Sequence, residues 1–531
     1  MNRFHPRSGV TADMAVVAAE SAGVCIRPHV RTVTDRLTGD TTSVPIPCGS
    51  TREAVCGPCA IKARRLRMHQ CREGWHLTHD PEQTTVPDAT PDDDGLDDDG
   101  QADGVSGIEE EQGSGAGRRV RSTARLSGFP DLPVVPMEQR TTGAAFEDPR
   151  TGATYRPSMF LTLTLPSYGK VVPGLGVPVD ARRYDYRRAA LDAILFPRLL
   201  DRFWQNLRRC AGFKVQYFSA IEAQRRLAPH LHAAVRGAIP RATIKAVTRA
   251  TYHAAWWPSL DTVVYDGDQL PTWDDDTGAY LDPVTAWPLP TWDEATADLV
   301  DPAHVVQFGA QVDVKGLLGG TPDSDRAVRY LCKYLTKNVA DTYAGTEDGT
   351  TTAYERHIDR LHDEVQWLPC SPTCGNWLRF GVTPKDSGPG LVPGRCQSPA
   401  HARANLGLGG RRVLVSRSWS GKTLTEHRAD RRTVVSEVLA AAGVDAGDAD
   451  RLAADHVLPD GTPRYVWEDS EPGSVDYVAV IAASLRQANT WRARYVDAKR
   501  TAAQRGSPPA GPSGPVDNRS ASAPPTATDA A

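Results

Sequence analysis

Two histidines separated by one residue lie in the segment EAQRRLAPHLHAAVRG, at residues 222–237. In a β-strand, residues i and i+2 point to the same face, so a strand here places the imidazoles of His230 and His232 side by side. Glu222 follows the apolar stretch FKVQYFSAI, and a turn after it would bring its carboxylate level with the histidines. Two imidazoles and one carboxylate on one face are typical of a divalent-metal site with open positions. Taken alone, the pattern also fits surface histidines on an edge strand.

A second group of reactive side chains lies in YLCKYLTK, residues 330–337, which repeats Tyr-x-x-Lys twice. On a helix, Tyr330, Tyr334 and Lys337 share one face, and Lys333 lies beside them. A tyrosine hydroxyl titrates at about pH 10 and is a weak nucleophile at neutral pH. A neighbouring ammonium and a metal-polarised phosphate make its attack feasible. The alternative is an amphipathic helix whose tyrosines pack and whose lysines face water.

The N-terminal region contains CGSTREAVCGPC and a further cysteine after a basic stretch. A Cys-x-x-Cys motif with additional thiols predicts a structural zinc site. The predicted ligands are Cys48, Cys56, Cys59 and Cys71. Cys25 lies upstream of this cluster. His69 and His76 are alternative ligands, and buried thiols without a metal are the alternative interpretation.

A second cluster consists of CSPTC followed about twenty residues later by CQSPAH. Two ligand pairs separated by such a loop predict a zinc-ribbon-like module. The predicted ligands are Cys370, Cys374, Cys396 and His401. Four protein ligands leave no open position, so this zinc would be structural; unliganded thiols are again the alternative.

The segments that carry these residues alternate between strand and helix patterns. The strand-like segments are 159–165, 213–222, 230–237 and 305–315, and the helix-like segments are 181–212, 240–257 and 323–339. Pro197 would kink or divide the first helix. The order β-α-β-β-α-β, followed by a helix, predicts an α+β fold with a ferredoxin-like (split βαβ) core. The two histidines fall on its third strand.

At 531 residues the chain is too long for one hydrophobic core, so we expect several regions. The predicted regions are an N-terminal Cys/His-rich zinc module (1–79), an acidic disordered linker (80–120), a catalytic domain (151–345) with an acidic loop insertion (261–301), a basic zinc-ribbon-like module (350–430), a small helical region (431–505) and a disordered tail (506–531).

The net charge of −4 conceals a basic protein. Residues 80–111 hold 13 Asp or Glu, residues 261–301 hold 11, and neither stretch holds Lys or Arg; without these acidic residues the remainder carries +20. A basic body favours a polyanionic partner. No apolar run approaches a membrane helix and the N-terminus lacks a signal-peptide pattern, so we expect a cytoplasmic protein with no membrane partner.

In combination, these motifs resemble the HUH endonuclease superfamily of rolling-circle replication initiators. FLTLTL resembles the first family motif, PHLHAAVRG the His-hydrophobic-His motif and YLCKYLTK the nucleophile motif, in order over 158–340. More closely, the chain is similar to replication initiators of actinobacterial plasmids and integrative elements through CGSTREAVCGPCAIKARRLR, CREGWHL and LGLGGRRVLVSRSWSGKTL.

The resemblance implies that Glu222, His230 and His232 hold Mg²⁺ or Mn²⁺ on a phosphate of plasmid origin DNA. A tyrosine would attack that phosphate, leaving a 5′-phosphotyrosine and a free 3′-OH that primes the host DNA polymerase. No helicase motifs are apparent, so strand separation would need a host helicase. Basic residues are expected to contact the DNA: Arg225, Arg236, Arg411, Arg412 and Lys422.

The family pattern hydrophobic-x-x-Tyr-hydrophobic-x-Lys fits Tyr334 with Lys337 best. Tyr330 with Lys333 is the alternative, and both tyrosines could act in turn. Other functions compatible with the sequence are a relaxase or transposase with the same chemistry, or a non-catalytic zinc protein that binds DNA.

Overall fold

The computed structural model describes residues 11–77, 81, 125–134, 146–152, 154–267, 269–337, 339–340, 351–409, 412–441, 457–470 and 475–504. The expected acidic linker, apart from residue 81, and the expected tail lie outside these ranges. Two compact units divide the chain: residues 71–421 contribute to one, while residues up to 70 and those from 422 onward contribute to the other. Within the described ranges no helix is both long and apolar enough to span a membrane.

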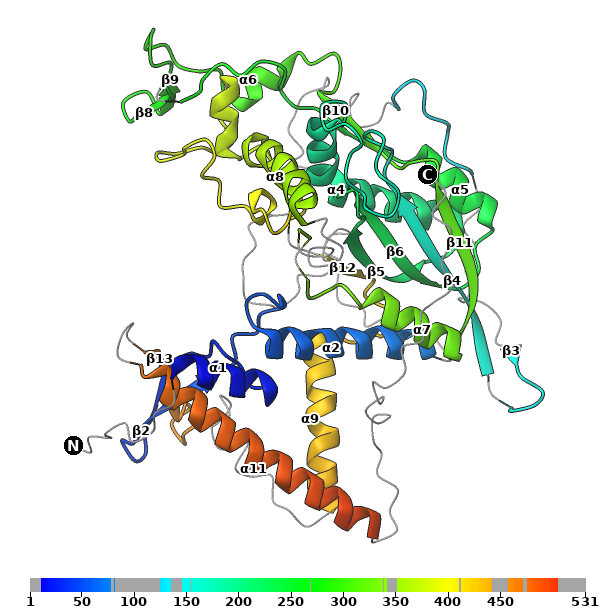
Figure 1. Cartoon of the computed structure of the whole chain (residues 1–531), viewed down its shortest axis with the longest axis vertical. Helices are drawn as coiled ribbons and strands as arrows, with labels where there is room; N and C mark the ends of the chain where they lie inside the picture. The colour runs from blue at the N-terminus through cyan, green and yellow to red at the C-terminus, as the bar shows by residue number, and fades with distance from the viewer. Residues whose placement is uncertain are drawn as a thin grey trace. The chain divides into compact units, whose positions relative to one another are not determined.

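The larger unit is built on an antiparallel sheet with the strand order β11-β4-β6-β5-β12 (Figure 1). Its strands are β4 (Thr154–Thr164), β5 (Gln216–Ala223), β6 (Pro229–Arg236), β11 (Val312–Gly319) and β12 (Val413–Val415), and a short β3 (Phe146–Glu147) pairs with β4. The expected mixture of helices with antiparallel strands is therefore present. Strands β5 and β6 form the expected hairpin.

One face of this sheet packs into the main hydrophobic core. Leu161, Ile221 and Leu231 point into it and are almost completely buried, together with Phe203 of the long helix α4 (Tyr186–Ala211). Because side chains alternate along a strand, the residues between them point to the opposite face, which carries the histidines. Pro197 lies inside α4 and does not divide it, which corrects the expectation of a boundary there.

The connection from β6 to β11 contains more strand than expected. Helix α5 (Arg241–Ala250) ends seven residues before the predicted end at 257, and β7 (Tyr252–Ala255) follows and pairs with β10 (His304–Gln307). The acidic insertion contains a β8–β9 hairpin (Thr272–Asp274 and Ala279–Leu281) and α6 (Trp292–Ala297). Tyr265, Tyr280 and Leu289 of the insertion form a small core with Leu378, so apolar packing gives this acidic segment its structure.

The tyrosine segment forms a shorter helix than its sequence predicts. Helix α7 (Pro322–Leu331) begins with a capping box between Thr321 and Ser324 and ends before Lys333. Beyond it the backbone N–H of Val339 donates to the carbonyl of Ala404 at 2.9 Å. The chain after α7 makes this long-range hydrogen bond instead of continuing the helix, and tertiary contacts commonly override local propensity.

The segment 351–421 belongs to the larger unit rather than forming a module of its own. It contains α8 (Thr351–Trp367), which packs along α4 (Figure 1), and two short 3₁₀ helices, η1 (Gly375–Phe380) and η2 (Pro399–His401). Its strand β12 hydrogen-bonds to β5 and extends the main sheet.

The smaller unit joins segments from both ends of the chain. It comprises α1 (Ala12–Ser21), β1 (His29–Asp35), β2 (Thr41–Ile46), most of α2 (Gly57–His76), α9 (Leu424–Ala441), β13 (Tyr465–Asp469) and α11 (Tyr477–Gln504). Strand β1 lies between β2 and β13, both antiparallel to it. The last turns of α2, from Cys71 onward, belong to the larger unit.

Candidate metal centre and tyrosine

The two histidines and the glutamate meet on the face of the sheet opposite the main core. Glu222 on β5 lies directly across from His230 on β6, and His232 is two residues further along the same strand. The two Nε2 atoms are 2.7 Å apart, and His232 Nε2 is 3.8 Å from a carboxylate oxygen of Glu222. One ligand atom from each residue lies within 4.8 Å of the others. The strand register thus creates a compact cluster from residues eight positions apart.

Burial sets the protonation of this cluster. Desolvation lowers the pKa of His232 to about 4 and that of His230 well below its ordinary value, so both imidazoles are neutral at neutral pH. Burial raises the pKa of Glu222 to about 7, against the opposing charges of Arg412 and Lys333. Neutral imidazoles carry the lone pairs that a metal ion needs, and a cation would favour the ionised carboxylate.

Two observations show that the cluster fits a cation. Oε1 of Glu222 and Nδ1 of His230 are buried without a hydrogen-bond partner, which is costly for polar atoms unless something else satisfies them. The Oγ1 of Thr162 on β4 lies 3.0 Å from Nδ1 of His232. If Nδ1–H donates to this oxygen, Nε2 is left with its lone pair facing the cluster. Two imidazoles and a carboxylate suit Mg²⁺ or Mn²⁺ as well as other divalent ions.

Of the two predicted tyrosines, Tyr330 is the one that reaches the cluster. Its hydroxyl lies 3.2 Å from Nε2 of His232, and its ring packs edge-on against that imidazole at 4.9 Å. Phe160 on β4 supports both rings. The Tyr330 side chain is 44% exposed, so a ligand can approach it. Partial burial and the charge of Glu222 raise the pKa of Tyr330 to about 12, so the hydroxyl is protonated at neutral pH.

Tyr334 occupies a different position because α7 has already ended. The ammonium of Lys333 lies 4.7 Å and that of Lys337 6.0 Å from the centre of its ring, so the two lysines flank Tyr334. The helical face that would bring Tyr330, Tyr334 and Lys337 into line is absent. The tyrosine that best matches the family pattern, Tyr334, is therefore not the one beside the two histidines.

The second cysteine cluster is assembled as predicted. Cys370, Cys374, Cys396 and His401 bring their ligand atoms together, with Cys374 Sγ 3.5 Å from His401 Nε2. The thiols of Cys374 and Cys396 donate to Cys370 and lower its pKa to about 3. His401 Nδ1 lies 2.8 Å from the carbonyl of Val365, which orients Nε2 toward the thiols. A Cys₃His set with an oriented imidazole fits zinc.

The N-terminal cluster differs from the prediction in one ligand. Cys48, Cys56 and Cys59 gather around Cys25, an upstream thiol that is not among the four predicted ligands. The Cys56 and Cys25 sulfurs are 3.8 Å apart, and a hydrogen bond from Cys59 lowers the pKa of Cys25 to about 4. Four thiols with one readily ionised fit zinc.

The expected fourth thiol, Cys71, is fully buried in the larger unit, where burial and the nearby thiol of Cys332 raise its pKa. Cys71 lies within α2, one helical turn before the buried Trp75. The spacing of the cysteines in the sequence does not reveal that this helix keeps Cys71 apart from the other three thiols. The alternative ligand His76 faces Asp325, and His69 lies against the ring of His427.

The predicted DNA-contacting residues differ in their exposure and in their partners. Arg236 is 1% exposed and donates to the carbonyls of Gly74, at 2.7 Å, and Trp419, so its role is structural. Lys422 pairs with Asp430 at 2.8 Å. Arg225 is exposed, and Arg411 lies outside the described residues.

Arg412 lies near the cluster of Glu222, His230 and His232. Its guanidinium donates to the carbonyl of Ile221 at 3.2 Å and to that of Lys337, and its charge acts on Glu222 and His230. It thereby connects the strand that carries Glu222 to the segment after α7.

Sequence reasoning did not identify Thr162 and Phe160. Both lie in FLTLTL, where the alternation of threonine and apolar residues signals a strand, and the register of β4 against β6 pairs Thr162 with His232. The histidine pair was the only sequence signal for these two residues, because the strand next to the histidines must supply the side chains that contact their imidazoles.

One known family matches most of the chain. The model of the family described as "Replication initiator protein, pSAM2" matches residues 11–487, which include both cysteine clusters, the histidine pair and the tyrosine helix. Neither a curated protein nor a solved structure matches the chain. Because the match extends over most of the sequence, the chain belongs to the replication initiator protein family of pSAM2.

Proposed function

We propose that the protein initiates rolling-circle replication by nicking origin DNA as a metal-dependent HUH endonuclease, with Tyr330 as the nucleophile. The observation that carries the proposal is the hydroxyl of Tyr330 at 3.2 Å from Nε2 of His232, beside Glu222 and His230. The strand order β11-β4-β6-β5 adds support, because it is the order expected of a split βαβ core with the histidines on its third strand.

In this proposal Glu222, His230 and His232 hold Mg²⁺ or Mn²⁺. The ion would polarise the scissile phosphate and stabilise the charge that develops on it. Thr162 keeps the imidazole of His232 in the orientation that presents Nε2. The neutral state of both histidines at neutral pH leaves their lone pairs available without prior loss of a proton.

Tyr330 performs the covalent step. Its Oη forms a bond to phosphorus while the bond from phosphorus to the 3′-oxygen of the preceding nucleotide breaks. The product is a 5′-phosphotyrosine and a free 3′-OH, and the proton lost from Oη balances the proton gained by the 3′-oxygen. Since one phosphodiester is exchanged for another, attack by a 3′-OH can reverse the step and rejoin the strand.

Basic groups next to the cluster are suited to the phosphate. Lys333 follows the end of α7, and its charge and that of Arg412 both act on Glu222. Two cations near the reacting group would attract the DNA backbone and offset its negative charge. Arg225 is exposed at the β5–β6 turn and would contact more distant phosphates.

The biological consequences follow from the free 3′-OH. It would prime synthesis by the host DNA polymerase at the plasmid origin, and a host helicase would separate the strands. The two cysteine clusters would hold structural zinc, since each supplies four ligands and no open position.

The test is covalent capture of DNA. The purified protein is incubated with Mn²⁺ or Mg²⁺ and single-stranded oligonucleotides tiled across the origin of the element that encodes it, and products are separated on denaturing gels. Wild type should give a metal-dependent protein–DNA adduct that disappears in Tyr330→Phe and His230→Ala.

Tyr334→Phe is the matched control, because it removes the same hydroxyl four residues away, and its adduct should persist. An adduct that Tyr330→Phe retains and Tyr334→Phe loses would reassign the nucleophile. Tight binding of duplex origin DNA without any adduct would instead indicate a non-catalytic DNA-binding protein.

A further inference from the structure

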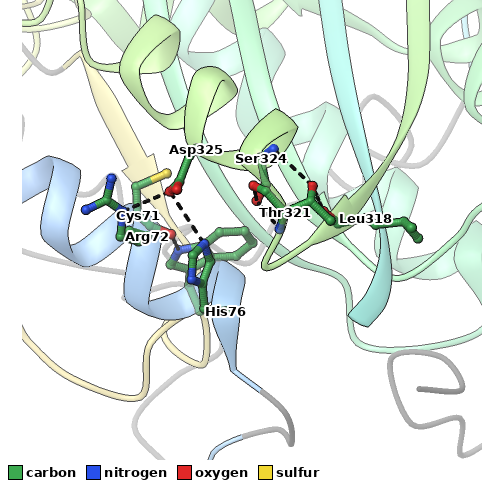
Figure 2. A network of polar contacts seen from close by, with 8 residues as sticks. Cys71, Arg72, His76, Leu318, Thr321, Ser324 and Asp325 are labelled. Carbon is green, nitrogen blue, oxygen red and sulfur yellow. Dashed lines mark hydrogen bonds and ion pairs between the residues drawn. The ribbon is translucent and has the colours of Figure 1, made fainter. Parts of the chain in front are cut away.

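The tyrosine helix contacts the last turns of α2, a segment more than 200 residues away in sequence. Arg72 Nε donates to Asp325 Oδ1 at 2.9 Å, and His76 Nε2 lies 3.7 Å from the same oxygen. Figure 2 shows Arg72 and His76 reaching from α2 toward Asp325, which lies in the first turn of α7. The contact therefore fixes the start of the helix that carries Tyr330.

A second contact lies at the other end of α7. Cys332, the residue that follows the helix, acts electrostatically on Cys71, and both thiols are fully buried. Residues 325 and 332 are seven positions apart, which is two helical turns, so they share one face. Arg72 and Cys71 are neighbours on α2. The last turns of α2 thus contact the first turn of α7 and act electrostatically on the residue that follows its last turn, on either side of Tyr330.

A third contact precedes the helix. Gly319, the last residue of β11, approaches α2 so closely that a Cβ added there would lie 2.7 Å from the carbonyl oxygen of Trp75 and 3.2 Å from its ring. Glycine is thus required by the close approach of the two backbones. Trp75 itself is 1% exposed.

We propose that the last turns of α2 position the nucleophile, and that the Arg72–Asp325 ion pair holds α7 so that the Tyr330 hydroxyl stays beside His232. Arg72 and Asp325 are positioning residues in this proposal, which rests on the proposed function. The remaining anchors of α7 are few: Ser324, Val328 and Leu331 are its buried residues. A ten-residue helix with so small a buried face depends on its ends for its exact placement.

The Arg72–Asp325 ion pair is better suited to fixing the position of α7 than to increasing the free energy of unfolding. Its side chains are 36% and 32% exposed, and ion pairs that contact solvent contribute little to the free energy of unfolding. Small displacements of a reacting group, by contrast, cost much of the rate, because attack needs the nucleophile close to and aligned with its target. Loss of the pair should therefore slow the reaction while leaving the fold and DNA affinity almost unchanged.

The first experiment compares Asp325→Asn with Asp323→Asn. Both replacements remove one negative charge from the first turn of α7, but among the described residues Asp323 forms its ion pair with the exposed Arg326 on the same helix. We expect the rate of adduct formation at saturating origin oligonucleotide to fall about tenfold or more in Asp325→Asn and to remain unchanged in Asp323→Asn. The oligonucleotide dissociation constant and the melting temperature should match in the two variants.

Two further comparisons distinguish a positioning role of these residues from a general loss of structure. Arg72→Lys should restore most of the rate lost in Arg72→Gln, and the double variant Arg72→Gln with Asp325→Asn should be no slower than either single variant. Gly319→Ala should slow the reaction, whereas Gly316→Ala on the same strand, where an added Cβ meets nothing within 4 Å, should not.

Equal rates in Asp325→Asn and Asp323→Asn, or additive losses in the double variant, would overturn the positioning role while leaving the nickase intact. A wild-type protein that forms no adduct with any oligonucleotide would overturn the proposed function and this proposal with it. A slow Asp325→Asn variant beside an active wild type supports both.

Discussion

At the scale of single residues, the geometry around His232 links three strands and a helix. Its imidazole contacts His230 on the same strand, Thr162 on β4, Glu222 on β5 and Tyr330 on α7. His232 is thus the common neighbour of the proposed metal ligands Glu222 and His230 and of the proposed nucleophile Tyr330, so its orientation would affect both.

Thr162→Val tests that orientation. The variant keeps the side-chain shape but removes the oxygen 3.0 Å from Nδ1 of His232, and we expect about tenfold to a hundredfold weaker Mn²⁺ binding. Isothermal titration of the protein with Mn²⁺ measures this directly. Thr164→Val is the control, because the Thr164 hydroxyl donates to the carbonyl of Gln311 and to neither histidine. Equal Mn²⁺ affinities in both variants would contradict the role given to Thr162.

The sequence was sufficient to predict that Glu222, His230 and His232 lie together, since strand alternation and one hairpin determine their geometry. It was insufficient to choose between Tyr330 and Tyr334. That choice depends on where α7 ends. The helix ends at Leu331, although the repeated Tyr-x-x-Lys pattern would let it continue through Lys337.

At the scale of elements, the Cys₃His cluster connects segments that have little regular structure of their own. Cys374 begins η1, His401 ends η2, and the carbonyl of Val365 in α8 orients that histidine. A bound zinc would hold these short helices together more firmly than their small apolar contacts can.

Cys374→Ser should therefore reduce bound zinc from two ions per chain to one and lower the melting temperature, as metal binding contributes directly to folding in such clusters. Zinc content by elemental analysis and thermal unfolding provide the readouts. His401→Cys should keep both ions because it supplies another zinc ligand, and Cys210→Ala should also keep both, since Cys210 lies in α4 outside either cluster. Two ions retained in Cys374→Ser would rule out this zinc site.

Most elements of the larger unit follow from hydrophobic pattern, and the differences have physical causes. The predicted strand 305–315 is two strands, because the chain bends at Ala310 between them. Strand β10 pairs with β7, whereas β11 pairs with β4. The strands β1, β2 and β13 were not predicted at all. The segments of β1 and β2 are polar and rich in threonine, without a continuous apolar face. The short β13 pairs with β1, a partner hundreds of residues away in sequence.

At the scale of the whole molecule, each compact unit contains its own cysteine cluster. Cys56→Ser should accordingly increase amide hydrogen exchange in β1, β2 and β13, whereas the strands β4, β5 and β6 should remain protected. Mass-spectrometric hydrogen exchange of Cys56→Ser, Cys374→Ser and wild type measures the effect unit by unit. Increased exchange across the main sheet in Cys56→Ser would show that the N-terminal cluster supports both units.

The pairing of β1 with β13 also has a consequence for the order of events on the ribosome. Arg31 and Asp469, which pair across these strands, are 438 residues apart, while the larger unit is complete by residue 421. Domains fold as they emerge, at a synthesis rate of about 5–20 residues per second. The nascent chain would therefore complete the larger unit, with Glu222, His230, His232 and Tyr330, first. The N-terminal strands β1 and β2 would remain without β13 for several seconds longer.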